Sequence, residues 1–318
     1  MSTGPGSKVP TKPSAYAKVF RQGATIVPRN LFFVNITDCP TPPPRLDQTY
    51  WGSTDEKQAL ESKKPYKDVR ISGSVEGCFI FSTALSRHLV PFRLLDPVYV
   101  VLPFETHDGA LNMLTAKQLK GKGFREFGKW MLTAENTWNE KRGSKSDKQS
   151  IYQRINYQNG VTNQSMKHRH LVLYNHSGMN VSATYFDRFS APAPFIVDVK
   201  LYWAAFSNLR EANYLAAILN SDIVNEAIKP FQSMGLLGER DIHKKVLDLP
   251  IPVFDGNDEQ HSNLADLGIA AHKQAKGVIR DGIFPVEGSL ASQRGYMRAA
   301  LGELHDEIEL IVAELLAI

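Results

Sequence analysis

The spacing of apolar residues changes along the chain, and this change limits the possible folds more than any other feature of the sequence. In the first two thirds, short apolar runs such as 78–81 and 98–102 are separated by serine, Arg-His and Asp-Pro, a pattern typical of strands and turns. In the last quarter, apolar residues recur in steps of three and four, which is typical of helices. We therefore predict an α+β fold: a mixed β-sheet with flanking helices and a helical C-terminal segment.

The individual elements follow from the same patterns. We expect strands at 24–27, 31–34, 89–95, 195–199 and 201–203, and a hairpin of 171–174 and 181–186 around the loop 175–178. Residues 115–142 predict a short turn and then a helix with a basic outer face. Asn208, with Glu211 three positions on, predicts the start of a helix that ends at Pro230, and 264–278 predicts another.

The end of the chain predicts one amphipathic helix. Its apolar residues have heptad spacing, and we call them the C-terminal stripe: Met297, Leu301, Leu304, Ile308, Ile311, Leu315 and Ile318. Side chains 298–318 carry a net charge of −4, which would repel DNA phosphates. We therefore expect this helix to pack antiparallel to the helix at 264–278; a second copy or a catalytic domain is the alternative partner.

Length and composition indicate a folded chain without a membrane anchor. The 318 residues, 42 % of them hydrophobic, suffice for one large or two smaller cores. No run approaches 18 apolar residues and the start lacks an apolar signal region, so we expect a cytoplasmic protein. Residues 1–13 are expected to form a flexible leader, 14–254 a recognition domain and 255–318 the helical segment. Cys39 and Cys78 belong to no metal-binding pair, and both are expected to be buried thiols.

Positive charge is concentrated in one part of the chain. Residues 117–154 carry a net charge of +6, whereas the whole chain carries +4. A localised cationic surface suits a polyanion such as nucleic acid. The alternative is an ordinary solvated helix face.

The stretch 150–164 offers hydrogen-bonding groups suited to DNA bases. It interleaves Gln, Asn and Arg with Tyr152 and Tyr157. Asn and Gln can bridge the N6/N7 edge of adenine, Arg can bridge the O6/N7 edge of guanine, and tyrosines can stack or contact phosphates. The alternative is a polar loop that its tyrosines anchor to the core.

Catalytic motifs are weak or missing. The sequence has neither the glycine-rich turn nor the (Asn/Asp/Ser)-Pro-Pro-aromatic loop of amino-methyltransferases, and it has no P-loop. A nuclease would be possible with Asp47, Glu61 and Lys63. The histidines of 167–170 with His176 could bind a metal, but a basic strand end explains them better; His243 near Asp241 could act as a general base.

Several stretches together resemble a known family. They are Tyr-Leu-Ala-Ala-Ile-Leu-Asn-Ser-Asp at 214–222, Phe-Gln-Ser at 231–233, Gly-Leu-Leu-Gly-Glu-Arg-Asp-Ile-His at 235–243 and Leu-Pro-Ile-Pro at 249–252. They resemble the C-terminal target-recognition region of type IIG N6-adenine DNA methyltransferases, which is related to type I specificity subunits. The segment 20–34 resembles the connection between catalytic domain and recognition region in that family. The clear resemblance covers 20–34 and 151–275.

This resemblance implies sequence-specific recognition of double-stranded DNA in restriction–modification and phage defence. It implies a methyltransferase catalytic domain or subunit as partner, S-adenosylmethionine bound there and not in this chain, and no catalytic or metal-binding residue here. The expected DNA-binding residues are Lys117, Lys120, Lys122, Arg125, Lys129, Gln153, Arg154, Asn156, Gln158, Asn163, Gln164, Lys167, Arg169, Arg240 and Lys244. A metal-dependent nuclease and a protein-interaction scaffold without DNA contact are the alternatives.

Overall fold

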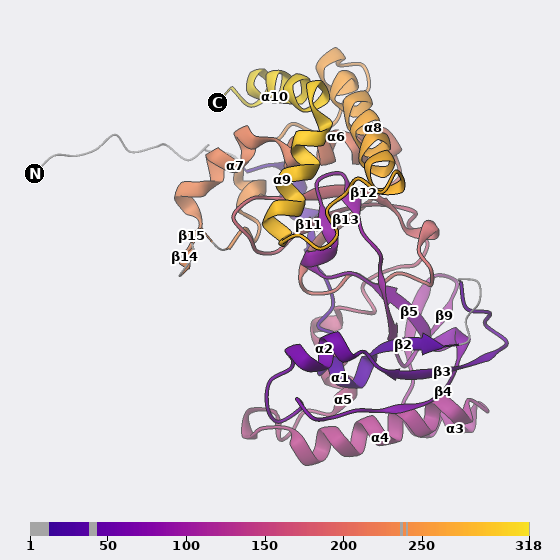
Figure 1. Ribbon diagram of the computed structural model, residues 1–318. Coiled ribbons are helices and arrows are strands. Elements are labelled where there is room, and N and C mark those ends of the chain that lie inside the picture. Colours follow the sequence, from indigo (N-terminus) through magenta and orange to yellow (C-terminus); the bar gives the residue numbers. More distant parts are fainter. Residues whose placement is uncertain (1–12, 38–42, 236–237, 240, 318) are drawn as a thin grey trace, which may run out of the picture.

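The computed structural model describes residues 13–37, 43–235, 238–239 and 241–317. These residues form two lobes, each built on an antiparallel sheet (Figure 1). Helices and antiparallel sheets together make an α+β fold, as the sequence predicts. None of the described helices is both long and apolar enough to cross a membrane.

The C-terminal lobe contains a four-stranded sheet covered by helices. Its strands, in the order β1-β13-β11-β12, are β1 (Arg21–Gln22), β13 (Leu201–Phe206), β11 (His170–Asn175) and β12 (Ala183–Asp187). Its helices are α6 (Leu209–Asn220), α7 (Asp222–Ile228), α8 (Glu259–Arg280), α9 (Leu290–Leu301) and α10 (Glu303–Leu316). Val172 and Tyr174 of β11 join the core shared with these helices, whereas Leu171 and Leu173 face the other side.

Helix α8 lies very close to α6. A β-carbon at Gly268 would lie 2.4 Å from the backbone oxygen of Asn213, so only glycine permits this approach. Leu264 and Ala271 of α8 belong to the same core as the sheet. Residues on both sides of position 254, the expected domain boundary, therefore contribute to one core.

The N-terminal lobe contains a five-stranded sheet that packs against a long helix. The sheet order is β4 (Ser72–Glu76), β3 (Thr49–Thr54), β2 (Phe33–Thr37), β8 (Val98–Val101) and β5 (Ile80–Thr83). Gly52 and Gly73 are paired directly opposite each other, and Trp130 packs over them. Its helices are α1 (Arg29–Phe32), α2 (Glu56–Glu61), α3 (Ala116–Gly121), α4 (Arg125–Lys141) and α5 (Ile151–Ile155).

Smaller elements complete the described chain. The two-stranded ribbons are β6 (Leu89–Val90) with β7 (Arg93–Leu94), β9 (Phe104–His107) with β10 (Ala110–Met113), and β14 (Met234–Gly235) with β15 (Gly238–Glu239). The 3-10 turns are η1 (Ala15–Lys18), η2 (Gly77–Phe79), η3 (Ser86–His88), η4 (Ser144–Ser146), η5 (Tyr157–Asn159), η6 (Arg188–Ser190), η7 (Lys229–Phe231) and η8 (Lys245–Asp248).

Two predicted helices are each divided in two. The helix expected from 208 to 230 breaks at Ser221, whose extended backbone (ψ 139°) ends α6 and whose side chain caps α7. The helix expected to carry the C-terminal stripe breaks at Gly302, which adopts φ +51°. Five described stripe residues still belong to the core of the C-terminal lobe: Met297, Leu301, Ile308, Ile311 and Leu315. Leu304 is half-buried and is not part of this core. Ile318 lies outside the described residues.

The strand predictions are correct only in part. The hairpin of β11 and β12 is confirmed, although its connection covers 176–182. Residues 24–27 and 195–199 are not strands and make only isolated bridges, and 31–32 belong to α1. Strands β3 and β4 were missed, because β4 has a single large apolar residue, Val75, and β3 contains Gly52.

Candidate nucleic-acid interface

The loop after α5 has an uncommon backbone conformation. Gln158 and Asn159 have φ angles of +51° and +58°, which L-residues rarely adopt. The side-chain oxygen of Asn156 accepts hydrogen bonds from the N–H groups of Val161 (3.1 Å) and Thr162 (3.2 Å) and so holds the loop closed. Uncommon backbone conformations cluster at functional sites, which makes the loop a candidate for binding.

A buried glutamine fixes the other end of this loop. Gln164 Nε2 donates to the carbonyl oxygens of Gly160 (3.0 Å) and Val197 (2.9 Å), and its Oε1 accepts from the Val197 N–H (2.8 Å). Gly160 lies so close to Ala24 that a β-carbon would be 3.1 Å from the Ala24 Cα. Gln164, predicted to contact a base, is instead a structural residue whose side chain does not reach the surface.

A polar pocket of about 420 Å³ lies beside the loop. The side chains in its walls come from β1, the loop and β13: Arg21, Gln22, Tyr157, Gln158, Asn163 and Trp203. Arg21, Gln158 and Asn163 are exposed, and guanidinium and amide groups of this kind can pair with base edges. The sequence-based prediction included Gln158 and Asn163 and missed Arg21 and Gln22. Arg21 lies in the segment 20–34, which resembles the known family, and this was the only sequence feature that could have indicated it. Its position in the pocket wall follows from the pairing of Arg21 with Trp203 between β1 and β13.

Helices α3 and α4, which carry most of the predicted lysines, lie on the outside of the N-terminal lobe (Figure 1). We call the following exposed residues the lysine face: Lys117, Lys120, Lys122, Arg125 and Lys129. Lys122 Nζ lies 2.8 Å from Glu105, and Lys129 Nζ lies 2.7 Å from Glu126. Such exposed pairs are weak and can exchange for phosphate contacts.

Two further predicted cations follow the loop and carry acidic partners. Lys167 Nζ lies 2.8 Å from Asp108 at the tip of the β9–β10 ribbon, and Arg169 Nη2 lies 2.8 Å from Asp187 at the end of β12. Both cations are exposed. The segment 157–169 therefore carries exposed amides at one end and exposed cations at the other.

The remaining predicted contacts have less favourable positions. Gln153 is exposed, but its Oε1 accepts from the Ser150 N–H (2.9 Å) in a helix cap. Arg154 is half-buried. Lys244 is exposed and donates to a backbone carbonyl at 3.0 Å, and Arg240 lies outside the described residues.

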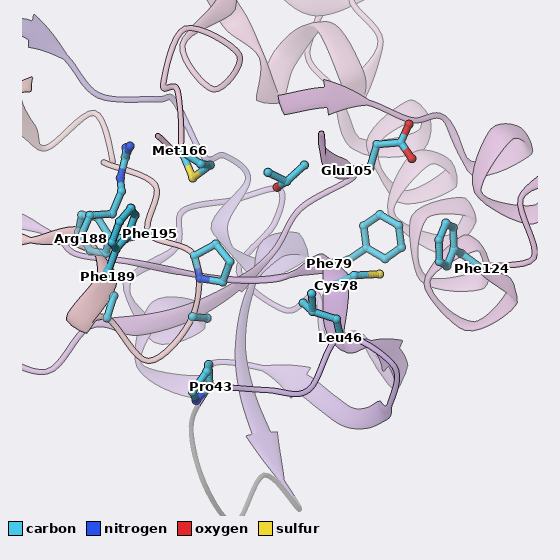
Figure 2. Close-up of a pocket in the computed structure, with 14 residues that line it drawn as sticks. Pro43, Leu46, Cys78, Phe79, Glu105, Phe124, Met166, Arg188, Phe189 and Phe195 are labelled. Carbon is cyan, nitrogen blue, oxygen red and sulfur yellow. The ribbon is translucent and has the colours of Figure 1, made fainter. Parts of the chain in front are cut away.

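An apolar pocket of about 470 Å³ lies where the two lobes meet (Figure 2). Phe79 and Phe124 line it on one side, and Phe189 and Phe195 on the other. Cys78, expected to be a buried thiol, is half-buried in its wall, and burial raises the pKa of this thiol to about 11. Cys39 lies outside the described residues.

The nuclease residues are engaged elsewhere. Asp47 pairs with Arg45 at 3.2 Å and Glu61 pairs with Arg87 at 2.6 Å, so both carboxylates face arginines. Of the histidines, His176 packs edge-on against His243 with ring centroids 4.4 Å apart. Neither arrangement forms a three-ligand group in the described part of the chain.

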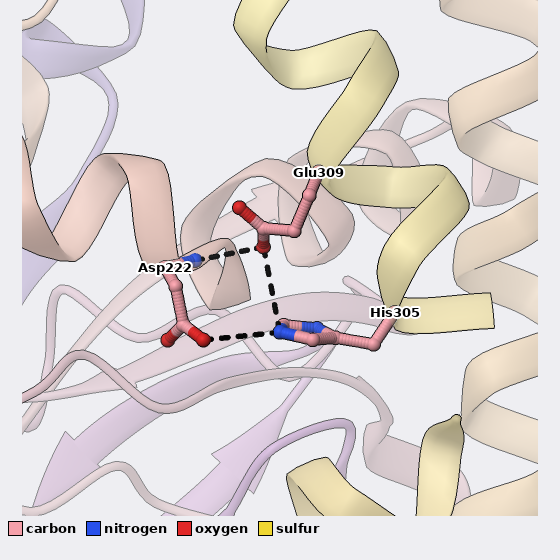
Figure 3. Close-up of side chains that lie close together, drawn as sticks. All are labelled: Asp222, His305 and Glu309. Carbon is pink, nitrogen blue, oxygen red and sulfur yellow. Dashed lines mark hydrogen bonds and ion pairs between the residues drawn. The ribbon is translucent and has the colours of Figure 1, made fainter. Parts of the chain in front are cut away.

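One group of possible metal ligands was not anticipated. His305 Nε2 lies 3.1 Å from Asp222 and 3.6 Å from Glu309 (Figure 3). Glu309 also accepts from the N–H groups of Asp222 (2.8 Å) and Ile223 (3.1 Å), which places it at the start of α7. Arg298 Nε lies 3.5 Å from Asp222, and the hydrogen bond with Asp222 raises the pKa of His305. Arg298 and the His305 ring face the two carboxylates, so the group is accounted for as a polar network that joins α7, α9 and α10.

Comparison with known proteins gives a structural likeness without a sequence match. No family model and no curated protein matches the sequence. The fold is similar to part of the type IIL restriction-modification enzyme MmeI, solved in complex with DNA, with a TM-score of 0.55 and 12 % identity over 96 % of this chain. The type IIG restriction endonuclease BpuSI is a weaker match, with a TM-score of 0.37 and 12 % identity over 94 % of the chain. The chain spans about one third of MmeI (33 %) and 30 % of BpuSI.

The fold of this chain is thus similar to part of a restriction–modification enzyme. At 12 % identity, the likeness to MmeI concerns the fold alone. As a similarity of fold, it agrees with the family resemblance noted in the sequence.

Proposed function

We propose that this chain reads the DNA sequence for a restriction–modification protein that methylates adenine at N6. In this proposal, methyl transfer takes place in a separate catalytic domain or subunit, which binds S-adenosylmethionine. The observation that carries the proposal is the match of nearly the whole chain to one third of an enzyme solved with DNA. Enzymes that extrude a base need additional protein surface to hold and read the surrounding duplex.

The surface chemistry supports a division between residues that hold the DNA backbone and residues that read its bases. The lysine face supplies cations that can neutralise phosphates without regard to sequence. The loop 157–163 and Arg21 supply amide and guanidinium groups that can distinguish bases. A loop fixed by the buried Gln164 presents these groups with little entropy to lose on binding.

The test is selection from random-sequence duplex DNA with the purified chain. Enrichment of one asymmetric motif supports sequence reading, whereas recovery of random sequences contradicts it. Incubation of the same duplex with labelled S-adenosylmethionine should give no incorporation above background. Methyl transfer by this chain alone would contradict the assignment of catalysis to another domain.

The same preparation separates the two alternatives. Magnesium-dependent cleavage of the duplex would favour a nuclease, and an Asp47→Asn variant would then lose it. Absence of any DNA shift at low salt would favour a protein-interaction scaffold.

A further inference from the structure

The apolar pocket between the lobes has the size and the aromatic lining of a small-molecule site. Its volume of about 470 Å³ lies within the range of about 300–1,000 Å³ that is usual for small-molecule sites. Phenylalanine rings line it from both lobes (Figure 2). Phe189 is 62 % exposed, although a phenyl ring in water is unfavourable.

An uncompensated positive charge lies in the pocket wall. Arg188 is 3 % exposed, and its Nε and Nη2 have no hydrogen-bond partner. Its Nη1 donates to the Ser165 carbonyl, and its guanidinium lies 5.9 Å from the ring of Trp203. No described residue forms an ion pair with it, and burial lowers its pKa to about 10. Because the free nitrogens lie beneath the surface, Arg188 acts on the pocket through its field, which favours electron-rich or anionic ligands.

Two cations also lie next to residues that line the pocket. Lys122 pairs with Glu105, which is a lining residue. Arg169 pairs with Asp187, which directly precedes the lining residues Arg188 and Phe189 and accepts from the Phe189 N–H at 3.0 Å. The pocket therefore combines apolar rings, one carboxylate acceptor and flanking cations.

We propose that this pocket accepts one unstacked nucleobase of the bound DNA, an inference that rests on the proposed function. Every base has a π-face that can stack on aromatic side chains. An exocyclic amino group could donate to Glu105, while Lys122 and Arg169 contact the phosphates on either side. An apolar protein segment would gain nothing from these cations.

The test uses the isolated chain and the duplex found by selection. Each base of the duplex is replaced in turn by a fluorescent analogue that is quenched in the base stack, such as 2-aminopurine for adenine, whose fluorescence rises when it leaves the stack. We expect a rise of several-fold at one position on binding. The DNA affinity of the chain is measured in parallel by anisotropy, so that binding and unstacking are separate readouts.

Two variants probe the pocket and one serves as the control. Phe189→Ala removes an exposed ring, and Ala191→Phe fills the pocket. Both should abolish the fluorescence rise, and Phe189→Ala should weaken specific binding about tenfold, the effect of removing one stacking partner. Phe231→Ala removes a ring of the C-terminal lobe that is 40 % exposed and should change neither readout.

The outcomes separate this inference from the proposed function. Specific binding without a fluorescence rise at any position overturns the pocket inference and leaves the proposed function intact. A rise that persists in Ala191→Phe also overturns it, because the base then leaves the stack without entering the pocket. Failure to bind duplex DNA at all overturns both.

Discussion

The arginines of α9 lie inside the C-terminal lobe, whereas the cations of α3 and α4 lie on the outside of the N-terminal lobe. Arg294 and Arg298 are largely buried, and each donates to a backbone carbonyl oxygen at 2.8 Å. Lys117, Lys120 and Arg125 are exposed and form no ion pair with the described residues. The positive side chains of α9 therefore take part in packing, whereas those of α3 and α4 remain available to a polyanion. A count of Lys and Arg along the sequence does not distinguish the two.

The largest expected effect tests the packing side of this comparison. Ile308→Asp in α10 places a carboxylate where the side chain is fully buried and should cost about 4 kcal/mol of unfolding free energy. Thermal unfolding should shift down by about 10 °C. Leu310→Asp, on the same helix but 69 % exposed, is the matched control and should leave the melting temperature nearly unchanged. Equal melting temperatures for the two variants would show that α10 does not pack as described.

The next effect tests the DNA side. Replacing the whole lysine face by alanine should reduce the slope of log K against log salt by about 0.9 for each phosphate that is no longer neutralised, or up to about 4.5 for five. The protein should keep its melting temperature, because these side chains are exposed. The slope is measured by anisotropy titrations at several salt concentrations between about 50 and 200 mM. An unchanged slope would mean that this face is merely solvated.

A smaller effect is expected from the loop beside the polar pocket. Gln158→Ala or Asn163→Ala should change sequence preference by about 1–3 kcal/mol at one base pair if the side chain makes a bidentate pair of hydrogen bonds with a base. The salt dependence should stay the same, because no charge is removed. Repeating the duplex selection with each variant measures this. Asn136→Ala, an exposed amide on α4, is a suitable control and should retain the wild-type motif.

The smallest effect concerns a buried carboxyl next to the loop. Burial raises the pKa of Asp198 to about 6 from 3.8, although Arg29 lies 3.7 Å away. The carboxyl of Asp198 therefore stays protonated to higher pH in the folded state than in the unfolded state. Its contribution to the free energy of unfolding falls as the pH rises from about 4 to 6 and is constant above pH 6. Asp198→Asn should remove this dependence and gain about 1 kcal/mol relative to wild type between pH 4 and 7, less than the full shift because a buried polar group remains. Melting temperatures at several pH values check the sign; a difference that shrinks as pH rises would contradict it.

Periodicity predicted the helices well but not where they break. The stripes that became α6, α8 and α10 were visible in the sequence because each helix buries one face. The break between α6 and α7 at Ser221 was not visible, because it involves a distant contact. The Ser221 Oγ donates to Glu309 at 2.9 Å, 88 residues further along the chain. Strands with few apolar residues, such as β4, show no alternation of apolar and polar side chains from which they could be predicted.

The candidate site was predictable only where its residues were close in sequence. Gln158 and Asn163 were found because they lie in one amide-rich stretch. Gln164, in the same stretch, turned out to be buried because it bonds to Val197, 33 positions away. Arg21 joins the site only through the pairing of β1 with β13. Composition pointed to the candidate segment, and tertiary contacts decide which of its side chains are exposed.

The most direct test of the division between holding and reading is the ratio of affinities for the selected duplex and a scrambled duplex at one salt concentration. The lysine-face variant should bind both duplexes more weakly and keep the wild-type ratio. The double variant Gln158→Ala with Asn163→Ala should bind the scrambled duplex as wild type does and lose much of the ratio. If the lysine-face variant loses the ratio while the loop variant keeps it, the roles assigned to the two surfaces are wrong.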